Sequence, residues 1–171
     1  IILYPKGGVS DLQEKQLTTL GGNITALEID GSFDDCLSMV KAAFIDRQLS
    51  DKFNLTSANS INISRLIPQA FYYFNAVRNL PDEAKAVFVI PSGNFGNLTA
   101  GLLAQKLGLP IRHFVAATNV NDVVPRYLAE GDYQPLPSIP TISNAMDVGA
   151  PSNCARMIEL FGDNWETMRE N

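Results

Sequence analysis

Residues 91–97, Pro-Ser-Gly-Asn-Phe-Gly-Asn, form the segment whose residue types point most directly to chemistry. They follow the apolar run Val87–Ile90, which is typical of a strand buried on both faces, and precede a helix expected over Leu98–Leu107. Two glycines allow successive backbone N–H groups to point to one side, and the helix adds its positive N-terminal end. The segment therefore predicts a cradle for an anion such as phosphate. A tight turn in which Asn97 caps the helix would need the same residues, and this alternative stays open.

Two known phosphate-binding patterns do not fit this segment. A Walker A loop needs a lysine followed by serine or threonine after its second glycine, and Gly96 is followed by Asn97 and Leu98. The dinucleotide fingerprint needs the spacing G-x-G-x-x-G, which residues 91–97 lack. The segment is therefore neither a nucleoside triphosphate loop nor a dinucleotide loop.

A second polar segment, residues 57–65 (Ser-Ala-Asn-Ser-Ile-Asn-Ile-Ser-Arg), lies at the start of the longest helical pattern, Ile61–Leu80. Asn59 or Ser60 could simply cap that helix. Arg65 is expected about one turn into the helix, where its guanidinium could bind an anion held at the helix N-terminus. The alternative is a solvated arginine.

Strand and helix patterns alternate along the chain, and this order predicts an α/β fold. Such alternation gives a three-layer arrangement, a parallel sheet with helices on both faces, and ligands bind where its strands end. The turns after Tyr4, Ile29, Ile90 and Ala117 are therefore the places for a site. The expected strands are Ile1–Tyr4, Ile24–Ile29, Val87–Ile90 and Ile111–Ala117, and the expected helices are Asp11–Leu20, Phe33–Arg47, Ile61–Leu80, Leu98–Leu107, Val123–Glu130 and Asn153–Phe161.

The composition of the 171 residues excludes several classes of protein. A hydrophobic fraction of 46% and a charged fraction of 18% suit a packed domain. The net charge of −5, without a basic stripe, argues against nucleic acid and membrane surfaces as partners. Cys36 and Cys154 match no zinc or redox spacing, and the single histidine, His113, leaves little room for a metal site or a Ser-His-Asp triad. We therefore expect no metal.

Four segments together resemble threonine synthases: Ser57–Leu66 (SANSINISRL), Pro91–Gly101 (PSGNFGNLTAG), Ala116–Asp122 (AATNVND) and Ser143–Val148 (SNAMDV). The opening Tyr4–Gly22 is similar to the same family, so the resemblance covers essentially the whole chain. It implies a pyridoxal-phosphate enzyme with the fold type II, tryptophan-synthase-like large domain. Such enzymes convert O-phospho-L-homoserine and water to L-threonine and phosphate.

The resemblance also implies a role for each candidate site residue. The cofactor phosphate would be held by Gly93, Asn94, Phe95, Gly96 and Asn97. The substrate phosphate would be bound by Asn59, Ser60 and Arg65, which match the family's Asn-Ser-(x)4-Arg element. The two anion sites indicated by the residues would thus serve two different phosphates.

The family's Schiff-base lysine lies in a Phe-Lys-Asp context, and this context is missing here, since Asp51-Lys52-Phe53 does not match it. No catalytic residue is therefore expected within residues 1–171. We expect an internal piece of a longer enzyme, mostly its large domain, with the lysine-bearing N-terminal region and the C-terminal region outside it. Such a piece would be inactive alone.

Two other functions stay open. One is a non-catalytic homologue that binds a phosphorylated metabolite, and the other is a related lyase or deaminase, which the Asn-Ser-(x)4-Arg element disfavours. The two scattered cysteines and the absence of a targeting segment favour the cytoplasm. The sequence leaves the oligomeric state open.

Overall fold

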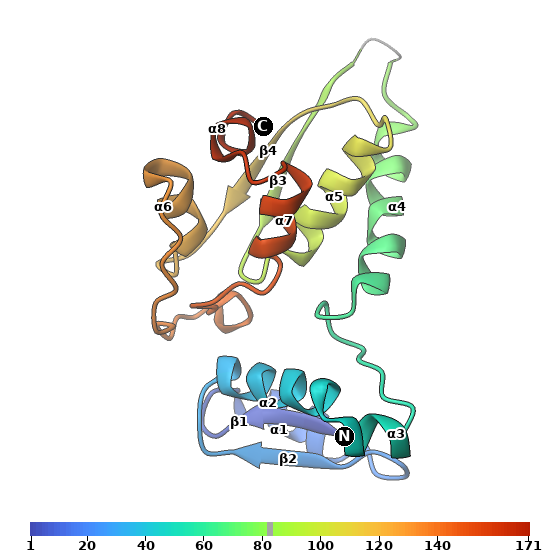
Figure 1. The fold of residues 1–171 in the computed structure, drawn as a ribbon, viewed down its shortest axis with the longest axis vertical. Helices are drawn as coiled ribbons and strands as arrows, with labels where there is room; N and C mark the ends of the chain where they lie inside the picture. Colours follow the sequence, from blue (N-terminus) through green and yellow to red (C-terminus); the bar gives the residue numbers. More distant parts are fainter. Residues whose placement is uncertain (82–83) are drawn as a thin grey trace. The chain divides into compact units, whose positions relative to one another are not determined.

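The computed structural model describes residues 1–81 and 84–171. The chain divides into two compact units, Ile1–Leu55 and Thr56–Asn171 (Figure 1). Each unit contains a pair of parallel strands with helices between and after them. This architecture confirms the expected α/β class.

The first unit is built around the parallel pair of β1 and β2, in which Ile2 lies opposite Ala26 and Pro5 opposite Ile29. Helices α1 and α2 both begin with a capping box, in which a serine hydroxyl accepts the N–H of the third helical residue. Along the chain the elements of this unit are β1 (Ile2–Pro5), α1 (Asp11–Thr18), β2 (Ala26–Ile29), α2 (Phe33–Ile45) and α3 (Arg47–Lys52).

Helix α3 was not expected, because residues 49–59 carry no apolar periodicity. Its start is fixed instead by Asp46, whose carboxylate accepts the N–H groups of Gln48 at 2.8 Å and Leu49 at 3.1 Å. An N-terminal cap of this kind can start a short helix without a buried face. None of the residues of α3 is buried.

The second unit carries both candidate segments. Its strands β3 and β4 pair in parallel, with Val87 opposite His113 and Pro91 opposite Ala117. Figure 1 shows α4 and α5 on one side of this pair and α6 on the other. The elements are η1 (Ile63–Arg65), α4 (Leu66–Val77), β3 (Ala86–Pro91), α5 (Gly96–Lys106), β4 (Ile111–Ala117), α6 (Val123–Glu130), η2 (Asn144–Met146), α7 (Cys154–Leu160) and α8 (Trp165–Glu170).

The described residues form two separate two-stranded sheets, where the alternation of patterns led us to expect one sheet. The strands and their parallel direction are as expected, but strand partners depend on contacts between distant segments. The pattern therefore predicts the strands and not the sheet that each strand joins.

Two helix starts also differ from expectation. The long helix begins at Leu66 rather than Ile61, because Asn62 caps the 3-10 turn η1 by accepting the N–H of Ser64 at 3.1 Å. Helix α5 begins at Gly96 rather than Leu98. Arg65 thus lies at the N-terminal boundary of α4, not one turn inside the helix.

The core of the second unit is formed by α4, α5 and the β3–β4 pair together with α6, α7 and α8. The ring of Tyr73 contacts Phe88 and Phe114 edge to face, with centroids 4.8 Å and 6.0 Å apart. Gly101 makes this packing possible, since a Cβ atom there would lie 2.6 Å from ring atoms of both Tyr73 and Phe114. The aromatic run 71–74 therefore contributes to the core mainly through Tyr73, while Phe71 and Tyr72 stay exposed.

Candidate anion-binding site

The loop between β3 and α5 is held in one conformation at both ends. The N–H of Ser92 donates to the carbonyl of Ala117 at 2.8 Å, which ties the end of β3 to the end of β4. Phe95, just before α5, has a φ of 59°, a left-handed conformation that is rare for residues other than glycine. Its side chain is buried. Buried packing thus maintains a backbone turn that costs conformational energy.

The turn leaves a run of backbone donors free. Within the described residues, no N–H group from Gly93 through Leu98 donates to a protein acceptor, and the first to do so is that of Thr99, to Phe95 at 2.9 Å. Free N–H groups at a helix N-terminus carry partial positive charge and bind anions. The observed loop therefore has the donors that a phosphate needs.

Asn97 does not cap α5, so the capped-turn alternative is wrong in this respect. Phe95 occupies the N-cap position and provides no side-chain hydrogen bond. The side chain of Asn97 instead accepts the hydroxyl proton of Tyr73 at 2.5 Å, and the Asn97 carbonyl lies 2.9 Å from the same hydroxyl. The N-terminal donors of α5 therefore remain available.

Ser60 brings the two candidate segments together. Its Oγ accepts a hydrogen bond from Nδ2 of Asn94 at 2.9 Å and a longer one from Nδ2 of Asn153 at 3.3 Å. Nδ2 of Asn153 also donates to the Asn94 carbonyl at 2.9 Å. A Cβ atom at Gly96 would lie only 3.2 Å from Cβ of Ser60. The segment around Ser60 is thus packed directly on the loop and on the first turn of α5.

Asn59 and Arg65 lie on the same segment but are less constrained. Oδ1 of Asn59 accepts the N–H of Ser60 at 2.7 Å, and its side chain is exposed. Arg65 is exposed, and no described residue forms an ion pair or hydrogen bond with its side chain. The structure therefore brings Ser60 to the loop, with Asn59 beside it, and leaves the Arg65 guanidinium free to bind an anion.

Three residues of the network were not singled out by the sequence: Ser152, Asn153 and Arg156. Oδ1 of Asn94 accepts both the N–H of Ser152 at 2.6 Å and its hydroxyl proton at 2.9 Å. Nη1 of Arg156 donates to the Ser60 carbonyl and to Oδ1 of Asn153, each at 2.6 Å. The only signal in the sequence was the spacing of Asn153 and Arg156, one turn apart at the start of a helix. This spacing does not predict which groups they contact.

A second polar network joins the other two segments, 116–122 and 143–148. Nδ2 of Asn119 donates to Oδ1 of Asp147 at 2.8 Å, and the N–H of Thr141 donates to Oδ2 of Asp147 at 2.7 Å. Burial raises the pKa of Asp147, but the hydrogen bonds from Thr141 and Asn119 outweigh it and lower the pKa overall. The network fixes Asp147 as a carboxylate.

This second network also supports the loop. Met146, next to Asp147, lies so close to Gly93 that a Cβ atom at Gly93 would be 2.7 Å from Cα of Met146. Only glycine fits at position 93. The four segments that carry the resemblance thus meet around one loop.

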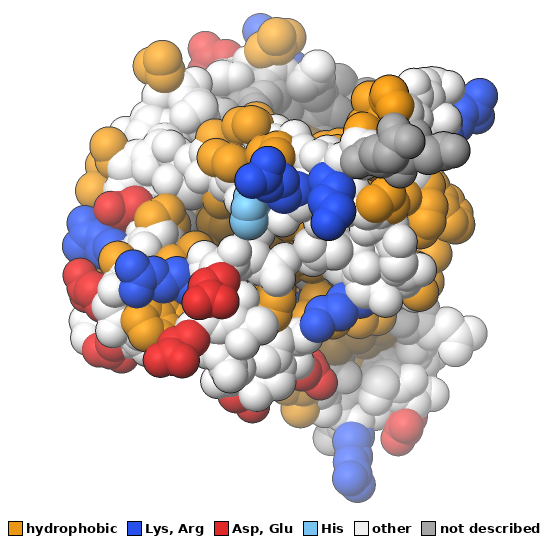
Figure 2. Space-filling model, turned by 90° about the horizontal axis from the view of Figure 1, so that it is seen from above, with side chains coloured by type: hydrophobic (Ala, Val, Ile, Leu, Met, Phe, Trp, Pro, Cys, Tyr) orange, Lys and Arg blue, Asp and Glu red, His pale blue; other side chains and the backbone are white. Residues whose placement is uncertain are grey.

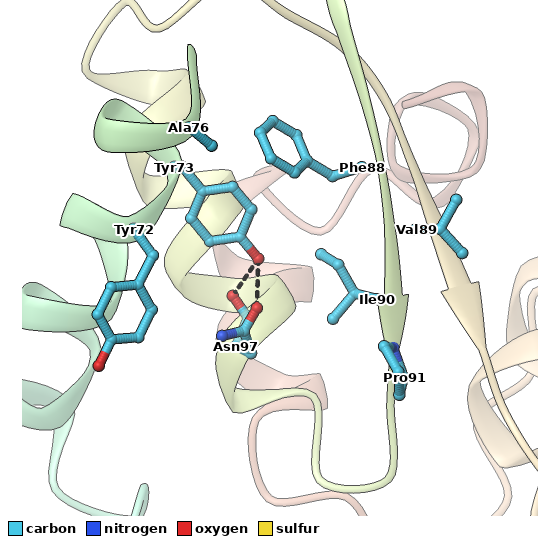
Figure 3. Close-up of a pocket in the computed structure, with 8 residues that line it drawn as sticks. All are labelled: Tyr72, Tyr73, Ala76, Phe88, Val89, Ile90, Pro91 and Asn97. Atoms are coloured by element: carbon cyan, nitrogen blue, oxygen red, sulfur yellow. Dashed lines mark hydrogen bonds between the residues drawn. The ribbon is translucent and has the colours of Figure 1, made fainter. Parts of the chain in front are cut away.

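An open apolar pocket of about 500 Å³ lies between α4 and β3 (Figure 3). Figure 3 shows the hydroxyl of Tyr73 directed at Asn97 in this pocket. Burial raises the pKa of Tyr73, so this hydroxyl stays protonated. The residues that line the pocket are Tyr72, Tyr73, Ala76, Phe88, Val89, Ile90, Pro91 and Asn97.

Among the residues that the structure describes, no group of three or more histidine, cysteine, aspartate or glutamate side chains could hold a metal ion. No helix in residues 1–81 and 84–171 has the length and apolar character needed to cross a membrane. Figure 2 shows acidic and basic side chains scattered among apolar ones on one face.

Several curated proteins are similar in sequence. The threonine synthase of Serratia marcescens is 59% identical over 163 residues, which is 94% of this chain and 38% of the relative. That of Haemophilus influenzae is 56% identical over 169 residues, covering 97% of this chain and 40% of the relative. No family model matches the sequence.

Two solved structures are similar in fold. The crystal structure of threonine synthase from Escherichia coli gives a TM-score of 0.88 at 57% identity and covers 95% of this chain and 38% of that one. A structure of PLP-bound threonine synthase from Brucella melitensis gives 0.76 at 40% identity, covering 98% of this chain and 37% of that one.

Fold and site together define a parallel α/β protein with a glycine-containing loop of free backbone N–H groups between a strand and a helix. Sequence and fold comparisons then place it more narrowly. The chain belongs to the threonine synthase family. It spans about two fifths of the length of the curated relatives it matches, 38% and 40% of the two named above.

Proposed function

We propose that this chain is the phosphate-binding part of a threonine synthase, a pyridoxal-phosphate-dependent lyase that converts O-phospho-L-homoserine and water to L-threonine and phosphate. The observation that carries the proposal is the hydrogen bond from Asn94 to Ser60, which joins two anion-binding segments in one site. The names of the relatives and the PLP-bound structure from Brucella melitensis support the reaction and the cofactor.

The loop Gly93–Asn97 would hold the cofactor phosphate. Its free N–H groups and the N-terminus of α5 fit a phosphate, and the glycines at positions 93 and 96 allow Met146 and Ser60 to pack closely against the loop. When bound, pyridoxal phosphate supplies an electron sink that stabilises negative charge on substrate carbons. The role of this loop is to fix the position of that cofactor.

Asn59, Ser60 and Arg65 would bind the substrate phosphate. Ser60 Oγ already accepts from Asn94 and Asn153, so its own proton is directed elsewhere. Oδ1 of Asn59 receives it only over 3.5 Å. A phosphate oxygen would be a better acceptor for this proton. The exposed guanidinium of Arg65 would add two parallel hydrogen bonds and a positive charge.

The covalent chemistry requires a lysine outside residues 1–171, as the base that moves protons at the substrate carbons. We therefore propose that the chain alone does not turn over substrate and that it forms most of the large domain of a longer enzyme. Cys36 and Cys154 are free thiols, which supports a reducing compartment such as the cytoplasm.

The test is Arg65→Ala in the full-length protein that contains this chain. Losing a bidentate charged contact removes about 1.5–3 kcal/mol, so KM for O-phospho-L-homoserine should rise about tenfold or more. The affinity for pyridoxal phosphate should change less than about threefold. Arg78→Ala, at the exposed C-terminal end of the same helix, is the matched control and should change neither. Equal losses of both affinities in Arg65→Ala would contradict the proposed division of roles.

A further inference from the structure

We propose that Arg156 is a positioning residue that sets the place of the substrate-phosphate segment relative to the cofactor loop. It lies on α7 and is not among the residues proposed above to touch either phosphate. Its guanidinium donates to two successive backbone carbonyls, those of Ser60 at 2.6 Å and Ile61 at 2.5 Å. The inference rests on the proposed function, which gives the segment its phosphate.

The two contacts fix the backbone where it leads from Ser60 toward Arg65. Nη1 bonds the Ser60 carbonyl and Nη2 the Ile61 carbonyl, so the planar fork of Arg156 holds two adjacent peptide groups at once. Ile63–Arg65 form the 3-10 turn that follows. The start of that turn is therefore tied to α7 rather than left to the exposed loop before it.

Arg156 also orients the amide that joins the two phosphate sites. Its Nη1 donates to Oδ1 of Asn153 at 2.6 Å, which leaves Nδ2 of Asn153 directed at Ser60 Oγ and at the Asn94 carbonyl. Asn153 has no exposed surface. A reversed amide would place its oxygen against the Asn94 carbonyl and its donors against the arginine. Arg156 thus selects the productive orientation of a buried amide.

The charge of Arg156 is not neutralised by an acidic partner. In the described part of the chain the single ion pair joins Arg126 and Asp122. The half-buried guanidinium of Arg156 therefore adds positive potential where Ser60 would receive a phosphate.

The test compares Arg156→Lys and Arg156→Gln with the unchanged protein, in the full-length holoenzyme. Lysine keeps the charge but lacks the planar fork that reaches two adjacent carbonyls, and glutamine keeps one amide NH2 group without charge. We expect KM for O-phospho-L-homoserine and the inhibition constant of inorganic phosphate to rise together, about tenfold for lysine and more for glutamine. We expect kcat and the affinity for pyridoxal phosphate to change less than about threefold. Arg126→Ala, at an exposed arginine, should change none of these values.

If Arg156 had only a structural role, its substitution would lower the melting temperature and leave both KM for O-phospho-L-homoserine and the inhibition constant of inorganic phosphate unchanged. This result would overturn the inference. An equal fall in cofactor and substrate affinity would also overturn it. If the unchanged holoenzyme does not convert the substrate, the proposed function fails instead. In that case, the affinity of each variant for inorganic phosphate, measured by calorimetry, tests the role of Arg156 independently of the reaction.

Discussion

Nδ2 of Asn94 lies 2.9 Å from Oγ of Ser60, a residue 34 positions earlier in the chain, and donates a hydrogen bond to it. This contact joins the loop after β3 to the segment before α4. Each of them has the features of an anion site by itself, and the contact makes them neighbours. A reaction that needs two phosphates side by side, one on a cofactor and one on a substrate, requires such an arrangement.

Asn94→Ala should weaken both phosphate sites at once in the full-length protein. The substitution removes the donor to Ser60 and the acceptor for the N–H and hydroxyl of Ser152. We expect the affinity for pyridoxal phosphate to fall and KM for the substrate to rise, each about fivefold or more, since each lost hydrogen bond contributes about 1 kcal/mol. Absorbance titration with the cofactor and steady-state kinetics measure the two effects.

Ser152→Ala is the matched control for this variant, because the N–H of Ser152 can still donate to Asn94. It should retain most of both affinities. A cofactor affinity that is unchanged in Asn94→Ala would contradict the role of this side chain.

Gly93→Ala should impair cofactor binding through a steric effect. The added Cβ atom would lie 2.7 Å from Cα of Met146, closer than van der Waals contact allows, so the loop or the segment 143–148 must move. Overpacking of this kind costs about 1–3 kcal/mol in the free energy of unfolding. Cofactor titration should show a loss of at least about tenfold in affinity.

Gly162→Ala separates this steric effect from simple backbone strain. Gly162 has a φ of 61° and nothing within 4 Å of a Cβ atom placed on it. The substitution should cost about 1–2 kcal/mol of stability and leave the cofactor affinity unchanged. Similar cofactor affinities in the two variants would argue against the close approach of Gly93 and Met146.

Asp147 should stabilise the second unit at neutral pH, and this contribution should be lost in acid. Its pKa is lowered in the folded state, where hydrogen bonds from Thr141 and Asn119 outweigh the effect of burial. A lowered folded-state pKa stabilises the fold above the unfolded pKa of about 3.9, and this stabilisation is lost as the pH falls through the folded value. Asp147→Asn should therefore be less stable at pH 7 and approach the unchanged protein as the pH falls below about 4.

Urea unfolding between pH 7 and pH 3 measures this effect. Glu130→Gln, at the exposed end of α6, is the control and should follow the unchanged protein closely. A gap between Asp147→Asn and the unchanged protein that stays constant across this pH range would contradict the proposed carboxylate network.

Cys154 should resist thiol reagents while the protein is folded. Burial raises the pKa of its thiol to about 11, from an ordinary value of 9.0. At pH 8 this lowers the reactive thiolate fraction about hundredfold, and burial adds a barrier to access. With Cys36→Ser to remove the other thiol, reaction with Ellman's reagent should be slow in buffer and fast in urea. Rapid reaction of the folded protein would show that α7 is not packed as described.

Local patterns predict much of the fold. Strand Ile111–Ala117 and helix Val123–Glu130 have the bounds that their apolar spacing and following glycine indicate. Helix α3 was missed because it depends on the carboxylate of Asp46 rather than on an apolar stripe. The start of α4 was predicted too early, because Asn62 caps a separate 3-10 turn, Ile63–Arg65, that precedes the helix.

The site is predictable only in part, and the reason is distance along the chain. The residue types of the loop 91–97 and of the segment 57–65 were enough to predict that each binds an anion. Their contact, and the role of Arg156 in holding it, arise between residues that are 34 and 96 positions apart. No local pattern encodes such contacts, because they depend on how α4, α5 and α7 pack in the folded unit.

The measurement that tests the central claim most directly uses the full-length protein, purified with pyridoxal phosphate and incubated with O-phospho-L-homoserine. We predict that L-threonine and inorganic phosphate form in equal amounts and that omitting the cofactor abolishes both. Binding of pyridoxal phosphate and substrate without threonine formation would contradict the claim. That result would instead favour a non-catalytic protein that binds a phosphorylated metabolite.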